Sequence, residues 1–176
     1  MSAFDTAISR ILIHEGEFTN SPKDSGNWTS GKINVGTLKG TKYGISAASY
    51  PYLDIKNLTE AQAKEIYYKD YWIANKLNLL NPDLAYQVLD ACIQHGSKKA
   101  IKFLQELVNE TQDGVIGDKT LSSVSKFNQE DLAILYIRRR INFYTNLQSS
   151  KWSSFGLGWM RRMADNLKYL TEHLSE

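Results

Sequence analysis

The chain has 176 residues, of which 42% are hydrophobic and 23% are charged, and its formal net charge at pH 7 is +2. This composition is ordinary for a globular protein and excludes a disordered chain, and the small charge gives no reason to expect a nucleic-acid partner. The single cysteine, Cys92, excludes a disulfide framework within the chain. No run approaches the roughly 18 apolar residues of a membrane span, so no stable membrane insertion is expected.

The first predicted helix ends near Gly16 and places Glu15 in its last turn. Its apolar residues recur at helical spacing: Phe4, Ala7, Ile8, Ile11 and Leu12. The negative end of the helix dipole disfavours an ionised carboxylate, so Glu15 is expected to be suited to donating a proton. The general acid of a glycoside hydrolase must do this. A frayed, solvated helix end is the alternative interpretation.

Between Gly31 and Gly40, Ile33, Val35 and Thr37 alternate with Asn34 and Gly36, which is typical of a small β-hairpin or an irregular loop. Asp24 precedes it in a sequence with ordinary turn chemistry, Asp24-Ser25-Gly26-Asn27. Thr41 follows it and leads directly into Tyr43-Gly44-Ile45.

The rest of the chain has helical periodicity. Thr59 to Gln62 is typical of a capping box, Asn81 and Pro82 of a cap with proline at the first helical position, and Asn128 of another cap. Six further helices are predicted: from 60 towards 72, from 82 to 96, over 100–108, a short one from 118, from 128 to 143, and over 160–174. The sequence therefore predicts a mostly α fold, a helical bundle with one small β-hairpin or irregular loop near 28–40.

The motifs along the chain resemble those of glycoside hydrolase family 108, the peptidoglycan muramidases found as phage endolysins and prophage lysozymes. One departure is Glu17, which stands where the family's Glu-Gly-Gly pattern has its second glycine. The resemblance rests on Glu15-Gly16-Glu17-Phe18, Asp24 to Thr29, Thr41 to Ile45, Tyr67 to Trp72, Asp90 to Gly96, Gln112 to Leu121 and Phe155 to Arg162.

This resemblance implies a lysozyme-like fold with two parts that together form one compact domain. Residues 1–96 would be a catalytic lobe carrying the Glu15 motif. Residues 97–176 would be a helical lobe resembling a peptidoglycan-binding module. Within the second lobe, the block from Asp113 to Leu121 either contacts glycan or completes the core.

The implied reaction is hydrolysis of the β-1,4 bond between N-acetylmuramic acid and N-acetylglucosamine in bacterial peptidoglycan. The family pattern makes Glu15 the general acid and Asp24 and Thr41 its catalytic helpers. For Asp24, a role confined to the turn is an equal alternative, because Asp-Ser-Gly-Asn favours turns.

Four residues are the predicted substrate contacts: Tyr43, Tyr71, Asp90 and Gln94. Aromatic rings suit the apolar faces of sugars, although aromatics at helical spacing are also common in cores. Asp90 and Gln94 are one helical turn apart and should face the same way. In the alternative interpretation, Asp90 bonds a neighbouring loop and Gln94 covers a helix end.

Two rival functions remain open from the sequence. A lytic transglycosylase would use the same glutamate but form an anhydro sugar. A catalytically silent wall-binding or secretion-helper protein is favoured by Glu17 in place of glycine. A zinc amidase would need three protein ligands, and the only plausible set is His14, His95 and Cys92, without a His-Glu-x-x-His motif or paired cysteines, so no metal and no cofactor is expected.

The expected partner is the glycan strands of peptidoglycan, and the protein is expected to be a monomer. Its first 15 residues lack the basic start, long apolar run and cleavage site of a signal peptide. It is therefore expected to be made in the host bacterial cytoplasm and to act at the cell wall or periplasm. A phage holin or secretion machinery would then provide export.

Overall fold

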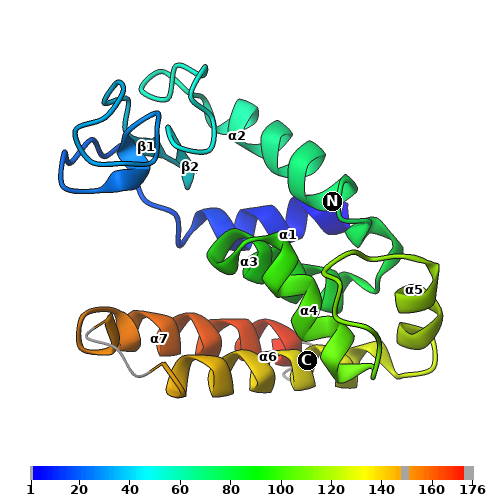
Figure 1. The fold of residues 1–176 in the computed structure, drawn as a ribbon. Helices are drawn as coiled ribbons and strands as arrows, with labels where there is room; N and C mark the ends of the chain where they lie inside the picture. The colour runs from blue at the N-terminus through cyan, green and yellow to red at the C-terminus, as the bar shows by residue number, and fades with distance from the viewer. Residues whose placement is uncertain (1, 148–150, 173–176) are drawn as a thin grey trace. The chain divides into compact units, whose positions relative to one another are not determined.

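The computed structural model describes residues 2–147 and 151–172, and it is mostly helical with one small antiparallel sheet, as predicted (Figure 1). The chain forms two compact units, Met1–Asp70 and Tyr71–Glu176. Within the described ranges, no helix combines the length and apolar character that a membrane span requires.

The first unit holds α1 (Ala3–Leu12), the short 3-10 helix η1 (Ser25–Asn27), strands β1 (Thr41–Lys42) and β2 (Ile45–Ser46), and α2 (Glu60–Tyr67). A π-helical segment, η2 (Tyr68–Ile73), follows. The second unit continues with η3 (Leu77–Leu79), α3 (Pro82–His95), α4 (Ser97–Leu107), α5 (Asp118–Val124), α6 (Gln129–Thr145) and α7 (Lys151–Thr171).

Helix α1 is amphipathic as predicted, but it ends earlier than expected. A capping box between Ser2 and Asp5 starts it, and its last buried residue is Ile11. The prediction that Glu15 lies in the last helical turn is wrong, because the helix ends at Leu12 and Glu15 donates its backbone N–H to the carbonyl of Leu12 in a tighter turn, at 3.3 Å. Beyond Ile11 no apolar side chain anchors another turn, since Ile13 is 74% exposed.

The small sheet lies at residues 41–46, directly after the segment where a hairpin or loop was predicted. β1 and β2 pair with Thr41 opposite Ser46, and their two-residue turn places Tyr43 at φ +52° and Gly44 at φ +75°. Positive φ at both central residues is the signature of the tight turn that suits a twisted hairpin. Residues 28–40 form an irregular loop, closed by an isolated bridge between Trp28 and Leu38.

Helix caps follow the sequence closely. Thr59 and Gln62 form the predicted capping box of α2, although the predicted helix to Trp72 divides into α2 and the π-helical segment η2. Asn81 caps α3 with Pro82 behind it, and Asn128 caps α6. These signals are short-range hydrogen bonds, so the local sequence is enough to specify them.

The second unit is built around α3, which packs against α4 and α6, while α6 packs against α7. The compact units divide between Asp70 and Tyr71. The catalytic lobe over 1–96 and the helical lobe over 97–176 stay a prediction. The last helix begins at Lys151, earlier than predicted, and Leu174 lies outside the described residues. Gln105 on α4 donates to Asp113 and accepts from the backbone of Gly114, so this turn is hydrogen-bonded to a buried side chain.

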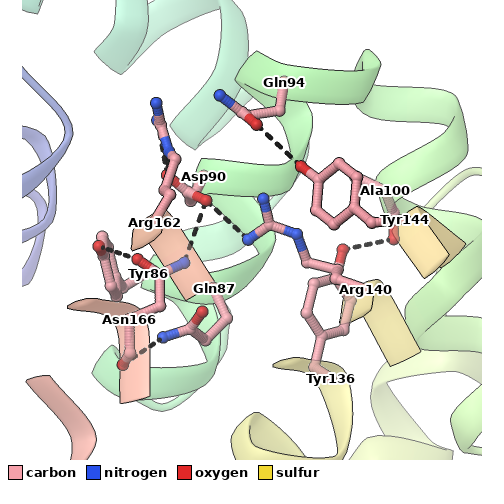
Figure 2. Close-up of polar contacts among 10 residues, drawn as sticks. All are labelled: Tyr86, Gln87, Asp90, Gln94, Ala100, Tyr136, Arg140, Tyr144, Arg162 and Asn166. Carbon is pink, nitrogen blue, oxygen red and sulfur yellow. Dashed lines mark hydrogen bonds and ion pairs between the residues drawn. The ribbon is translucent and has the colours of Figure 1, made fainter. Parts of the chain in front are cut away.

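A single carboxylate joins three helices of this unit (Figure 2). Asp90 on α3 is fully buried and accepts hydrogen bonds from Arg140 Nη1 on α6 (2.6 Å), and from Arg162 Nε (2.8 Å) and Asn166 Nδ2 (3.1 Å) on α7. Burial by itself would raise the pKa of Asp90, but the two guanidinium groups outweigh it and hold the pKa well below its usual range.

Asp90→Asn should lower the free energy of unfolding by about 3–5 kcal/mol, because it leaves two buried guanidinium groups without their counter-charge. Asp131→Asn, at an exposed first-turn position of α6, is the matched control and should cost about 1 kcal/mol or less. Urea unfolding followed by circular dichroism measures both. Equal losses in the two variants would contradict a stabilising role for the Asp90 carboxylate.

The Asp90 carboxylate should also make the free energy of unfolding depend on pH in the acidic range. Its folded pKa lies below the value of about 3.9 in the unfolded chain, so its contribution is complete above about pH 5 and declines as the pH falls further. Unfolding curves recorded between pH 3 and pH 7 should show this decline in the wild type and a weaker one in Asp90→Asn.

Candidate active site

The carboxylate of Glu15 is packed against the backbone of the β1–β2 turn. Glu15 is half-buried, and a Cβ atom added to Gly44 would lie 2.8 Å from its Oε2 and 3.2 Å from its Cδ. The backbone N–H of Tyr43 donates to the carbonyl of Gly16 at 3.3 Å, which joins the turn to the segment after α1. Glycine at position 44 thus meets two demands, positive φ and room for the carboxylate.

Tyr67, near the end of α2, contributes the third side of this site. Its hydroxyl donates to the carbonyl of Tyr43 at 2.8 Å, and its ring is almost completely buried. The same added Cβ on Gly44 would lie 2.5 Å from this hydroxyl oxygen. Three segments that are distant in the sequence therefore meet at Gly44: the hairpin that contains it, the turn after α1 that carries Glu15, and the end of α2 that carries Tyr67.

Asp24 and Thr41 are linked through one small helical turn. Asp24 caps η1 and accepts from the backbone N–H of Gly26 at 2.9 Å, with its side chain exposed. Thr41 Oγ1 donates to Oδ1 of Asn27, the last residue of η1, at 2.7 Å. Asn27 is fully buried and also donates to the carbonyl of Ser21. Both predicted helpers thus hold this loop in place.

Two of the four predicted sugar contacts are half-buried aromatics. Tyr43 lies in the hairpin turn, with Lys42 Nζ 5.3 Å from its ring centroid. Tyr71 lies in the π-helical segment, where its carbonyl accepts from the side chain of Asn75.

The other two, Asp90 and Gln94, lie on α3 in different surroundings. Gln94 is half-buried at the last turn of the helix and accepts from the hydroxyl of Tyr144 at 2.8 Å. Asp90 is enclosed by α6 and α7, with no exposed surface, so it belongs to the helix core and not to a sugar-contacting surface. The predicted bond to a neighbouring loop is replaced by ion pairs to helices, which the local sequence does not specify.

Two residues of the site were not singled out from the sequence. Neither Tyr67 nor Asn27 was given a role in the site, and Asn27 was assigned only to a turn. Their presence in the motifs Tyr67 to Trp72 and Asp24 to Thr29 was the available signal. Among the described residues, no three histidine, cysteine, aspartate or glutamate side chains are arranged to hold a metal ion.

Two family models match the chain, and the two matched ranges contain the motifs identified in the sequence. The family model described as Glycosyl hydrolase 108 matches residues 8–96, and the model described as Predicted Peptidoglycan domain matches residues 99–164. The first range includes Glu15, Asp24 and Thr41. No curated protein matches the chain.

A solved structure of SagA from Brucella abortus is similar to this chain. The two are 28% identical, with a TM-score of 0.77, and the match covers 95% of this chain and 92% of SagA. The mostly helical architecture with its small two-stranded sheet is consistent with a lysozyme-like fold.

Gly44→Ala should lower the free energy of unfolding by more than about 1 kcal/mol, since alanine at φ +75° is strained and its Cβ would meet Glu15 and Tyr67. Gly16→Ala is the control, because its added Cβ meets no atom within 4 Å, and it should change stability by about 0.5 kcal/mol or less. Thermal melts of both variants test this. Similar melting temperatures for the two would mean that position 44 does not need glycine.

Proposed function

Because this chain belongs to the glycosyl hydrolase 108 family, we propose that it hydrolyses the β-1,4 bond between N-acetylmuramic acid and N-acetylglucosamine in peptidoglycan, with Glu15 as general acid. Family membership makes the chain a glycoside hydrolase, and the peptidoglycan domain over 99–164 indicates peptidoglycan as its partner. The identity of the bond that is cleaved and the role of Glu15 as the acid are the parts that we propose.

The observation that carries the proposal is the packing of the Glu15 carboxylate against Gly44. A general acid must be held within reach of the oxygen that it protonates, because misplacement by about 1 Å can cost a hundredfold in rate. The turn after α1, the tight hairpin turn and the Tyr67 hydroxyl restrict where this carboxylate can lie. The arrangement requires glycine at positive φ at position 44, and glycine loses more conformational entropy on folding than other residues. This cost is explained if Glu15 must be held in one position.

Asp24 and Thr41 act as helpers in this proposal, by orienting water or by stabilising charge as the glycosidic bond breaks. Two contacts support this role: Thr41 in β1 donates to Asn27 of η1, and Asp24 caps the same short helical turn. A helper needs fixed geometry as much as the acid does.

The proposed substrate also suggests where the protein works. Peptidoglycan lies outside the cytoplasmic membrane, so the proposal includes synthesis in a bacterial cytoplasm and action at the cell wall. Export through a phage holin or a secretion machinery would connect the two.

Glu15→Gln should reduce lysis of purified peptidoglycan by about 10²- to 10⁴-fold, the usual effect of losing a general acid. Glu17→Gln, in the same motif and exposed, is the matched control and should retain lysis within a few-fold. A turbidity assay with both variants, after circular dichroism has shown that they are folded, measures the effect. Lysis by Glu15→Gln at a rate near wild type would exclude it as the acid.

Asp24→Asn and Thr41→Ala should each lower the lysis rate less than Glu15→Gln does. Thr41→Ala should also lower the free energy of unfolding by about 1–3 kcal/mol, because the buried Asn27 loses its hydrogen-bond donor. Parallel melting and turbidity measurements separate the two effects. Reduced melting temperature with unchanged specific activity would restrict both residues to holding the loop.

A further inference from the structure

Two adjoining cavities lie on the second unit, around the junction of α3 and α4, and they share His95 and Lys99 as lining residues. We call the first the aromatic cavity; it measures about 260 Å³ and is lined in part by Gln94, His95, Lys99, Phe143, Tyr144 and Trp159. We call the second the lysine cavity; it measures about 460 Å³ and is lined by His95, Gly96, Ser97, Lys98, Lys99 and Lys102.

The aromatic cavity has aromatic walls and a polar group. Tyr144 and Trp159 are stacked with ring centroids 4.9 Å apart, and the His95 ring lies 5.2 Å from that of Phe143. The Tyr144 hydroxyl donates to Gln94 Oε1, so the amide nitrogen of Gln94 faces away from Tyr144, as Figure 2 shows. Gln94 thus adds one amide group to a lining that is otherwise largely aromatic, a combination of apolar and polar groups that suits a sugar ligand.

The positive charge of the lysine cavity comes from its three lysines. Burial, followed by the nearby charges of Arg140 and Lys99, lowers the pKa of His95 to about 4, so this ring is neutral at neutral pH. His95 Nε2 has no hydrogen-bond partner among residues 2–147 and 151–172. None of the described lining residues of the cavity is acidic. The cavity therefore favours an anionic group.

The Asp113–Gly114 turn supports the position of Lys98. A Cβ atom added to Gly114, which has φ +81°, would lie 2.6 Å from Lys98 Cγ and 2.8 Å from its carbonyl oxygen. Gln105 holds the turn by accepting from the N–H of Gly114 and donating to the Asp113 carboxylate. The turn packs against the aliphatic chain of Lys98, so it affects the lysine cavity only by holding this lysine in place.

We propose that the two cavities form one binding site for the part of peptidoglycan where a muramoyl sugar carries its stem peptide. The aromatic cavity takes the acetamido and sugar portion, and the lysine cavity takes the carboxylates of the stem peptide through charge-assisted hydrogen bonds. This inference rests on the proposed function, since peptidoglycan supplies such a ligand. The residues matched by the peptidoglycan family model, 99–164, include Lys99, Lys102 and Trp159.

The test is binding of a soluble disaccharide–tetrapeptide to the full chain carrying Glu15→Gln, so that hydrolysis does not consume the probe. Lys99→Glu and Lys102→Glu, each added to this background, should weaken binding at least about tenfold in isothermal titration calorimetry. Lys126→Glu, at an exposed position outside both cavities, is the matched control and should bind within about twofold of the parent. A peptide-free N-acetylglucosamine tetramer and a tetrapeptide with amidated carboxylates should both bind weakly.

Equal affinity of Lys99→Glu and the parent would overturn the site, and so would equal affinity for amidated and free carboxylates. Because both lysines lie at least partly on the surface, circular dichroism should show unchanged folding in these variants. The experiments can contradict the proposed binding site and the proposed function independently of each other. Lysine-dependent binding in a protein that does not lyse walls supports the site alone, and lysis by the wild type without lysine-dependent binding overturns the site alone.

Discussion

The buried carboxylate of Asp90 determines how three helices of the second unit meet. An isolated charge in the interior is strongly unfavourable, so α6 and α7 can pack on α3 only in the arrangement that brings Arg140 and Arg162 to this carboxylate. Such a pair specifies one packing more than it adds net stability. The same three helices carry Gln94, Tyr144 and Trp159, so the ion pairs that order the core also order the walls of the aromatic cavity.

The first unit depends on a different constraint, the positive φ angles of the hairpin turn. Because Gly44 has no side chain, the Glu15 carboxylate and the Tyr67 hydroxyl both approach its α-carbon. A side chain at that point would displace one of them. The conformation of the turn therefore positions the proposed acid, although the turn itself contributes no reacting group.

Sequence reasoning succeeded where the determinants are local. The caps at Thr59, Asn81 and Asn128 are hydrogen bonds within a few residues, and all three were predicted. The mostly helical fold followed from apolar periodicity, and the family followed from motifs at fixed spacing.

It failed where a contact joins distant segments. Asp90 was predicted to contact sugar because its helical face is shared with Gln94, but its partners are 50 and 72 residues away in the chain. The tight turn at Tyr43 was missed because tyrosine rarely adopts positive φ, and the role of Tyr67 depends on α2 packing against the hairpin. The helix end assigned to Glu15 was wrong, because α1 ends at Leu12.

The most direct test of muramidase action is the chemical nature of the ends that the protein produces. Purified peptidoglycan digested with the wild-type protein should give, by mass spectrometry, fragments that end in reducing N-acetylmuramic acid, each heavier by one water than an anhydro product. Dominant anhydro-muramyl ends would make the protein a lytic transglycosylase. Reducing N-acetylglucosamine ends, or free stem peptides, would contradict cleavage of the proposed bond.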